Sequence, residues 1–130
     1  MANKEAFRFG NFMEEVYGFA QAVKAGDTIY VSGQTAFQTD GSIAGTGDMA
    51  EQMRAAYRNI EKVLREFGAT MDDIVEETLY VTDIMGAAGA AHDVRGEFYG
   101  ERYDVASTLI GVAALGLPDL LIEIRCTARV

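Results

Sequence analysis

A single glutamate interrupts the last apolar stretch of the chain. Glu123 stands between Ile122 and Ile124, where a carboxylate needs either a cationic partner or a raised pKa. Arg125 and Arg129 follow at even spacings, which puts all three charged side chains on one face of a strand. The pattern therefore has two interpretations: a structural ion pair, or a carboxylate held in place for chemistry.

The other reactive side chains exclude several kinds of catalytic site. His92 is the only histidine and Cys126 the only cysteine, so one chain cannot build a usual zinc site or an internal disulfide. A Ser-His-Asp triad would depend on His92, and no nucleophile-elbow motif accompanies it. We expect His92 on a helix surface, Cys126 as a packed and unreactive thiol, and no metal or cofactor.

Two hydroxyl side chains open the longest apolar run, residues 106–118 (ASTLIGVAALGLP). Strand alternation gives two faces, one with Ser107, Leu109, Gly111 and Ala113 and the other with Thr108, Ile110, Val112 and Ala114. The second set suits a core covered by helices, whereas the first is thin enough for a ligand to approach closely. We therefore predict that Ser107 and Leu109 line a cleft and that Thr108 faces the helices.

The elements that would position these residues alternate between strands and helices. The residue periodicities predict two strands in 21–34, single strands in 74–84, 106–118 and 120–130, and helices between Asp48 and Gly68 and over 85–100. One face of the last strand is apolar and should pack on the helices: Leu120, Ile122, Ile124, Cys126, Ala128 and Val130. The order β-β-α-β-α-β-β favours an α+β fold with helices on one face of the sheet.

Composition is that of one soluble domain, 1–130, with 49% hydrophobic and 24% charged residues. The net charge is −9 and the eleven lysines and arginines are scattered, which disfavours nucleic-acid binding. No apolar leader opens the chain, and no stretch is long enough for a membrane helix. We expect a cytoplasmic protein that does not contact membranes.

Three segments together resemble the Rid family, also called YjgF/RidA or L-PSP. They are QAVKAGDTIYVSGQ (21–34), YVTD (80–83) and LPDLLIEIRCTA (117–128). The resemblance runs from about Phe19 to the C-terminus. It implies a chorismate-mutase-like homotrimer with helices outside, sheets lining the centre, and clefts between subunits that bind a small metabolite. A cleft at the subunit interface would explain the charged face of the last strand.

The resemblance also implies an activity and a set of site residues. The best-known family members hydrolyse reactive enamines and imines, such as 2-aminoacrylate, to ketoacids and ammonia. In this sequence the backbone of Ser32 and Gly33 would contact the ligand, and Glu123 would orient water or ligand as the catalytic residue. A ligand-binding asparagine of the family falls at or beside His92.

Two departures from the family pattern put the usual substrate in question. Ser107 occupies the position of an arginine that forks onto the substrate carboxylate, and Phe19 replaces a tyrosine. A bidentate arginine contact is strong and is not reproduced by a hydroxyl. We therefore predict poor 2-aminoacrylate deaminase activity, with Arg125 or Arg102 as the candidate substitute cation.

Three functions remain open on this basis. The first is a Rid-type hydrolase acting on an enamine or imine other than 2-aminoacrylate. The second is a ligand-binding or regulatory trimer without turnover, which the missing arginine and tyrosine favour. The third is an endoribonuclease, which the −9 charge and the single histidine disfavour.

Overall fold

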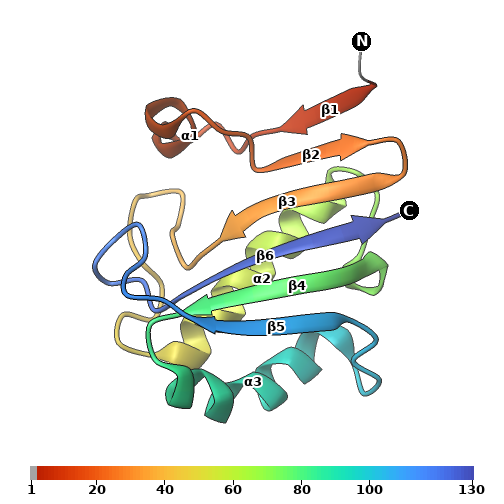
Figure 1. Cartoon of the computed structure of the whole chain (residues 1–130). Helices are drawn as coiled ribbons and strands as arrows, with labels where there is room; N and C mark the ends of the chain where they lie inside the picture. The colour runs from red at the N-terminus through yellow and green to blue at the C-terminus, as the bar shows by residue number, and fades with distance from the viewer. Residues whose placement is uncertain (1–2) are drawn as a thin grey trace.

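The computed structural model describes residues 3–130 and contains one six-stranded sheet (Figure 1). The strands lie in the order β1-β2-β3-β6-β4-β5. Their bounds are β1 (Lys4–Phe7), β2 (Ala22–Ala25), β3 (Thr28–Gln34), β4 (Ile74–Val81), β5 (Ala106–Gly111) and β6 (Ile122–Arg129). Neighbouring strands run antiparallel except β4 and β5, which are parallel and joined through a helix.

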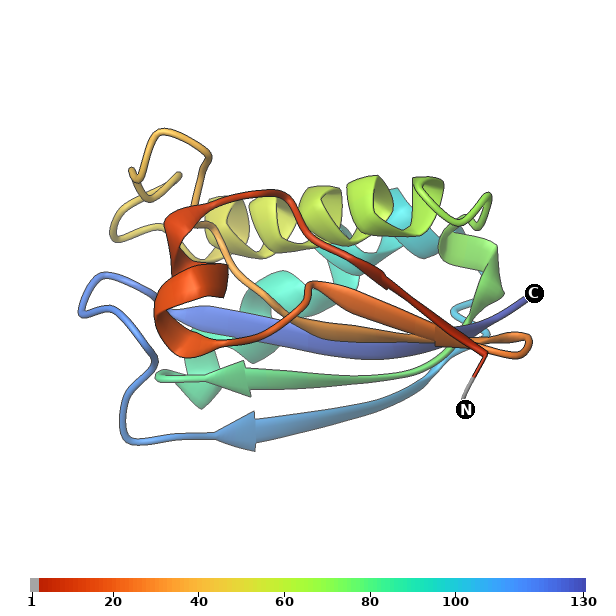
Figure 2. The same ribbon diagram turned by 90° about the horizontal axis from the view of Figure 1, so that it is seen from above.

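The two long helices, α2 (Met49–Arg65) and α3 (Ile84–Tyr99), cover the same face of the sheet, as the edge-on view of Figure 2 shows. Asp48 caps α2 by accepting a hydrogen bond from the Glu51 N–H, as a capping residue should. The buried side of α2 includes Met53, Tyr57 and Ile60. The predicted α+β class and the placement of helices on one face are confirmed.

The apolar face of β6 lies at the centre of the core. Ile122, Ile124, Cys126 and Ala128 are fully buried between the sheet and the helices, as the alternation predicted. Leu120 is buried in the loop before β6, whereas Val130 lies beyond the end of the strand and is 52% exposed, which corrects its predicted burial. Burial raises the pKa of the Cys126 thiol to about 12, so this side chain is a packed thiol and not a nucleophile. The charged residues of β6 therefore point to the opposite, helix-free face.

The N-terminal segment was not predicted. It forms β1, which extends the sheet beside β2, followed by the short helix α1 (Phe12–Tyr17). Asn11 and Glu14 form a capping box at the start of α1, and Gly18 ends it in the left-handed conformation. These four- and six-residue elements are too short to give a periodic signal in the sequence.

The apolar run 106–118 is a strand only as far as Gly111, which corrects the predicted extent. Residues 112–121 form a loop that contains Gly116 and Pro118. Gln52, fully buried on α2, holds this loop: its amide donates to the Asp119 carbonyl at 2.8 Å and accepts from the Leu121 N–H at 2.8 Å. The loop thereby closes over the end of β3 and β6.

Candidate functional site

Glu123 projects from the helix-free face of β6 and lies directly over Gly33 of β3. A methyl group added to Gly33 would overlap the Glu123 carboxylate, so only glycine leaves room for it. The pairing of β3 with β6 shifts register between Val31 and Gln34, which places Gly33 in the irregular stretch. The bulge and the missing side chain together make the space that Glu123 occupies.

The Glu123 carboxylate has no cationic partner within residues 3–130. Arg125 lies 3.4 Å from Glu76 Oε1, and Arg129 lies 3.0 Å from Asp27 Oδ2. Burial raises the pKa of Glu123, and no hydrogen bond or neighbouring charge offsets that rise. The ion-pair interpretation is therefore wrong, and an unpaired, partly buried carboxylate remains.

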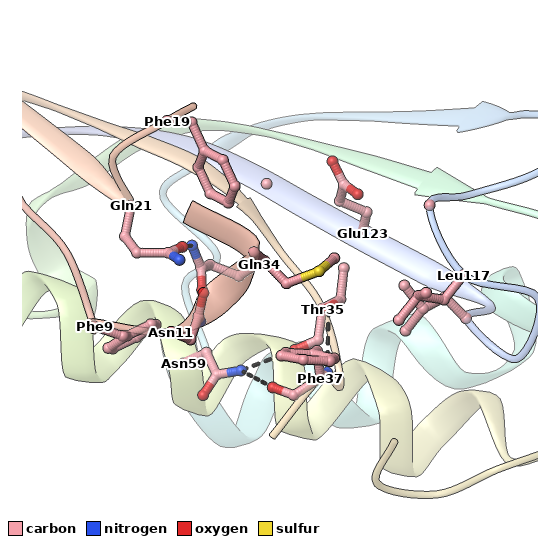
Figure 3. Close-up of a pocket in the computed structure, with 14 residues that line it drawn as sticks. Phe9, Asn11, Phe19, Gln21, Gln34, Thr35, Phe37, Asn59, Leu117 and Glu123 are labelled. Atoms are coloured by element: carbon pink, nitrogen blue, oxygen red, sulfur yellow. Dashed lines mark hydrogen bonds between the residues drawn. The ribbon is translucent and has the colours of Figure 1, made fainter. Parts of the chain in front are cut away.

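A cavity of about 140 Å³ opens beside Glu123 (Figure 3). Its walls come from the segment before β2, the end of β3, helix α2 and the loop before β6. Six of the lining residues are apolar or aromatic, six are polar and two are glycines: Phe9, Asn11, Met13, Phe19, Gln21, Gly33, Gln34, Thr35, Phe37, Asn59, Gly116, Leu117, Leu120 and Glu123. Of the predicted site residues, the cavity brings together Phe19, Gly33 and Glu123.

A chain of buried polar side chains runs along one wall of this cavity. Gln21 Nε2 donates to Glu14 Oε2 at 2.8 Å, and Gln34 Nε2 donates to Gln21 Oε1 at 2.8 Å. Glu14 also accepts three backbone N–H groups, from Phe9, Gly10 and Asn11. Burial raises the pKa of Glu14, but these hydrogen bonds outweigh burial, so its pKa is lowered and it stays ionised.

Ser107 corrects the predicted orientation of β5. Its hydroxyl donates to Glu77 Oε2 at 2.6 Å, on the helix-covered side of the sheet. Because β5 runs parallel to β4 with Ser107 opposite Glu77 and Leu109 opposite Leu79, Ser107 and Leu109 share the helix face and Thr108 faces away. The two faces were correctly separated but wrongly assigned, since every residue of β5 is exposed in the single chain and apolar character gives no direction there.

Sequence reasoning also missed the buried carboxylate that Ser107 contacts. Glu77 is 1% exposed, and besides Ser107 it accepts hydrogen bonds from Tyr57, Tyr99 and Arg95. The Arg95 Nε lies 3.0 Å from Glu77 Oε2 and makes the pair a buried ion pair. The only sequence signal was a second glutamate in the apolar strand 74–84, at a position facing the helices.

The remaining candidates lie outside the cavity. Ser32 donates to the Ala20 carbonyl at 2.7 Å and so anchors the segment that carries Phe19. His92 is exposed on α3 beside Tyr103, as expected for a helix-surface residue. Arg125 is paired with Glu76, and Arg102 lies 2.9 Å from Asp104 on the surface. Within one chain, no predicted cation therefore reaches Glu123.

The fold and the glutamate over a glycine define a class of small α+β proteins, and comparison with known proteins names the class. Residues 11–130 match the family model described as Endoribonuclease L-PSP, so the chain belongs to the Rid/YjgF/L-PSP family. A member of the YjgF/YER057c/UK114 family from Mycobacterium tuberculosis superposes with a TM-score of 0.86 at 32% identity, covering 98% of this chain and 100% of that one.

Two relatives indicate the range of the family. A RutC family protein of Pyrococcus abyssi is 32% identical over 111 residues, covering 85% of this chain and 84% of its own length. A 2-iminobutanoate/2-iminopropanoate deaminase of Dermatophagoides farinae is 31% identical over 97 residues, covering 75% and 74%. Small-molecule binding or imine deamination is thus the role at the level of the family. Across residues 3–130, none of the helices has the length and apolarity required to span a bilayer.

Proposed function

We propose that this protein is a cytoplasmic homotrimer that binds a small metabolite in clefts between subunits. There it hydrolyses an enamine or imine, other than 2-aminoacrylate, to a carbonyl compound and ammonia. The observation that carries the proposal is Glu123, an unpaired carboxylate over Gly33 at the edge of an apolar cavity. A carboxylate whose pKa is raised toward neutrality is suited to both accept and donate a proton.

The reaction needs one water molecule and one group that moves protons. Water adds to the carbon of the protonated imine while Glu123 takes a proton from that water, which gives a neutral carbinolamine. The protonated Glu123 then gives this proton to the amino nitrogen, and the C–N bond breaks as the carbonyl forms. The ionised Glu123 takes the remaining hydroxyl proton and passes it to the departing ammonia, which leaves as ammonium. An enamine first takes a proton on carbon to become the protonated imine. Glu123 starts and ends ionised, so the cycle closes.

The proposed trimer would complete the site from a second subunit. The cavity of one chain lacks Ser107, Leu109 and His92, which lie on or near the exposed strand β5 and helix α3. Ser107 and Leu109 face the helices of their own chain, so we propose that the edge strand β5 of a neighbouring subunit covers the cavity through the helix-free face of the sheet. The exposure of Tyr30 and Ile110 on that face supports this arrangement.

The proposed substrate differs from 2-aminoacrylate because Ser107 cannot replace a bidentate arginine. Its hydroxyl is already committed to Glu77 as a donor, and the single chain brings no free arginine to the cavity. Each lost charge-assisted hydrogen bond costs about 1.5–3 kcal/mol of binding. Slow turnover of 2-aminoacrylate and faster turnover of another imine are the expected pattern.

Ammonia release tests the proposal directly. Enzymatically generated 2-aminoacrylate and a carboxylate-free imine, formed from benzylamine by a flavin amine oxidase, are incubated with a high concentration of the protein, and the rate above spontaneous hydrolysis is measured. Faster hydrolysis of the carboxylate-free imine than of 2-aminoacrylate supports the proposal. No acceleration of either, with thermal stabilisation by benzylamine, would instead identify a binding protein without turnover.

A further inference from the structure

The cavity beside Glu123 is lined by one acidic side chain and, within the described chain, by no basic side chain. Glu123 is the single ionisable side chain among the fourteen that line it, and the described chain contributes no lysine, arginine or histidine to its walls. Apolar and aromatic side chains form most of the remaining surface: Phe9, Met13, Phe19, Phe37, Leu117 and Leu120. A ligand that enters therefore meets an apolar wall and one negative charge.

The buried chain of amides fixes which atoms of Gln34 remain for a ligand. An ionised carboxylate only accepts hydrogen bonds, so Glu14 must receive the amide nitrogen of Gln21. The oxygen of Gln21 therefore faces Gln34 and takes one of its amide hydrogens, while the Ser32 carbonyl takes the other at 3.1 Å. The Gln34 Oε1 atom is left, and it can only accept.

Asn59, on helix α2, is also oriented by its hydrogen bonds so that its oxygen is left over. Its amide nitrogen donates to the carbonyls of Thr35 and Phe37, at 2.9 and 3.5 Å, as the dashed lines in Figure 3 show. The Asn59 oxygen is thus free to accept. Donors that remain in the lining, such as the Asn11 amide and the Thr35 hydroxyl, carry no charge.

From this arrangement we infer that the cavity takes a ligand with an apolar body and a hydrogen-bond-donating or cationic head, an amine or a protonated imine, and excludes a carboxylate. The inference rests on the proposed function in placing the ligand beside Glu123. A cationic head gains the attraction of Glu123, whereas a carboxylate would be buried beside that charge without a cationic partner.

A neighbouring groove provides an internal control. It shares Phe9, Asn11, Phe37 and Asn59 with the cavity but ends at Arg58 and Lys62 on the outer side of α2. An anionic ligand attracted to this protein would sit there and not beside Glu123. Replacing Arg58 should therefore leave binding of a cationic ligand unchanged.

Three ligands with the same benzyl body and different heads test the inference: benzylammonium, benzyl alcohol and phenylacetate. Their affinities are measured by NMR titration of the full-length protein, following the amide signals of Gly33, Gln34 and Glu123. We expect benzylammonium to bind at least tenfold more tightly than phenylacetate. In Glu123→Gln this ratio should fall below threefold, and in Arg58→Ala it should stay as in the wild type.

Tighter binding of phenylacetate at the same three signals would overturn the inference and leave the ligand-binding site in place. A preference for benzylammonium that survives in Glu123→Gln would also overturn it, because Glu123 would not be its source. If none of the three ligands shifts these signals, both the inference and the proposed function fail.

Discussion

At the residue scale, Glu123 works against the stability of the fold. Burial raises its pKa above the value in the unfolded chain, so the folded state holds a proton more tightly. Stability therefore falls as pH rises from the ordinary glutamate range through the raised pKa. A carboxylate kept in such a place is typical of a functional site.

The substitution Glu123→Gln should show how much the partly buried charge of Glu123 destabilises the folded state. We expect the melting temperature at pH 7 to rise by a few degrees, because the amide does not have to ionise in a partly buried site. The gain should shrink as pH is lowered below the ordinary glutamate range, where both proteins are uncharged at this position. Melting curves from pH 3 to 8 check this, and a lower melting temperature at pH 7 would show that Glu123 has a stabilising partner.

Gly33→Ala tests the close approach between the two strands. The added methyl group would displace the flexible end of Glu123 rather than the backbone. We expect the protein to remain folded, with a melting temperature within a few degrees of the wild type, and imine hydrolysis to fall at least tenfold. Unchanged hydrolysis would mean that the position of the carboxylate is not important. Gly89→Ala, at a glycine of α3 with open space around it and no positive φ, controls for the exchange of glycine for alanine where nothing is displaced.

The sequence showed Glu123 but not its surroundings. Its apolar neighbours and its face of the strand followed from alternation along a single strand. Its lack of a partner depends on Glu76 and Asp27, which draw Arg125 and Arg129 away from distant parts of the chain. The hydrogen bonds that link Glu14, Gln21 and Gln34 could not be predicted either, because they also join distant parts of the chain and a neutral glutamine gives no sequence signal until its contacts are known.

At the scale of elements, strand β5 is held to the helices through one buried carboxylate. Glu77 joins α2 through Tyr57, α3 through Arg95 and Tyr99, and β5 through Ser107. All four donors depend on this one side chain. Removing it leaves a partly buried guanidinium and the hydroxyls of Tyr57, Tyr99 and Ser107 without their acceptor.

Glu77→Ala should therefore destabilise the protein by about 3–5 kcal/mol, the usual cost of removing one partner of a buried ion pair. Urea unfolding measures this. The adjacent Glu76→Ala is the matched control, because Glu76 pairs with Arg125 on the exposed face and its loss should cost less than about 1 kcal/mol. Equal losses of stability in the two variants would show that the hydrogen bonds of Glu77 do not hold β5 and the two helices together.

The elements differ in how well the sequence predicted them. Helix α2 and strand β6 have long, regular apolar patterns and were both predicted, β6 together with its buried face. Strand β5 was extended too far and turned over, because its residues are apolar on both faces and no local rule shows where a strand yields to a glycine-containing loop. Only its pairing with β4 shows its direction.

At the scale of the whole molecule, β5 is an edge strand of the sheet. It pairs with β4 on one side, and its other side has no neighbouring strand in the described chain. Leu109 and Ile110 are each 38% exposed there. An exposed edge of this kind is normally covered, and the proposed homotrimer would cover it. We expect light scattering to give about three times the mass of one chain.

Ile110→Glu should dissociate that assembly. The new charge would be buried at the proposed interface without a partner, which is costly. Lys62→Glu, on the outer face of α2, should leave the mass unchanged. A wild-type monomer at micromolar concentration, or an Ile110→Glu protein with the wild-type mass, would contradict the proposed arrangement.

The role of Glu123 in moving protons is tested most directly by the rates of ammonia release by the wild type and Glu123→Gln under the same conditions. Imines with and without a carboxylate are generated in situ, the former from 2-aminoacrylate and the latter by a flavin amine oxidase acting on benzylamine. We expect the wild type to accelerate hydrolysis of the carboxylate-free imine more than that of the other. We also expect Glu123→Gln to lower this rate about 100-fold or more, within the range of general acid–base catalysis. Equal rates for the wild type and Glu123→Gln would show that Glu123 does not move protons in the reaction.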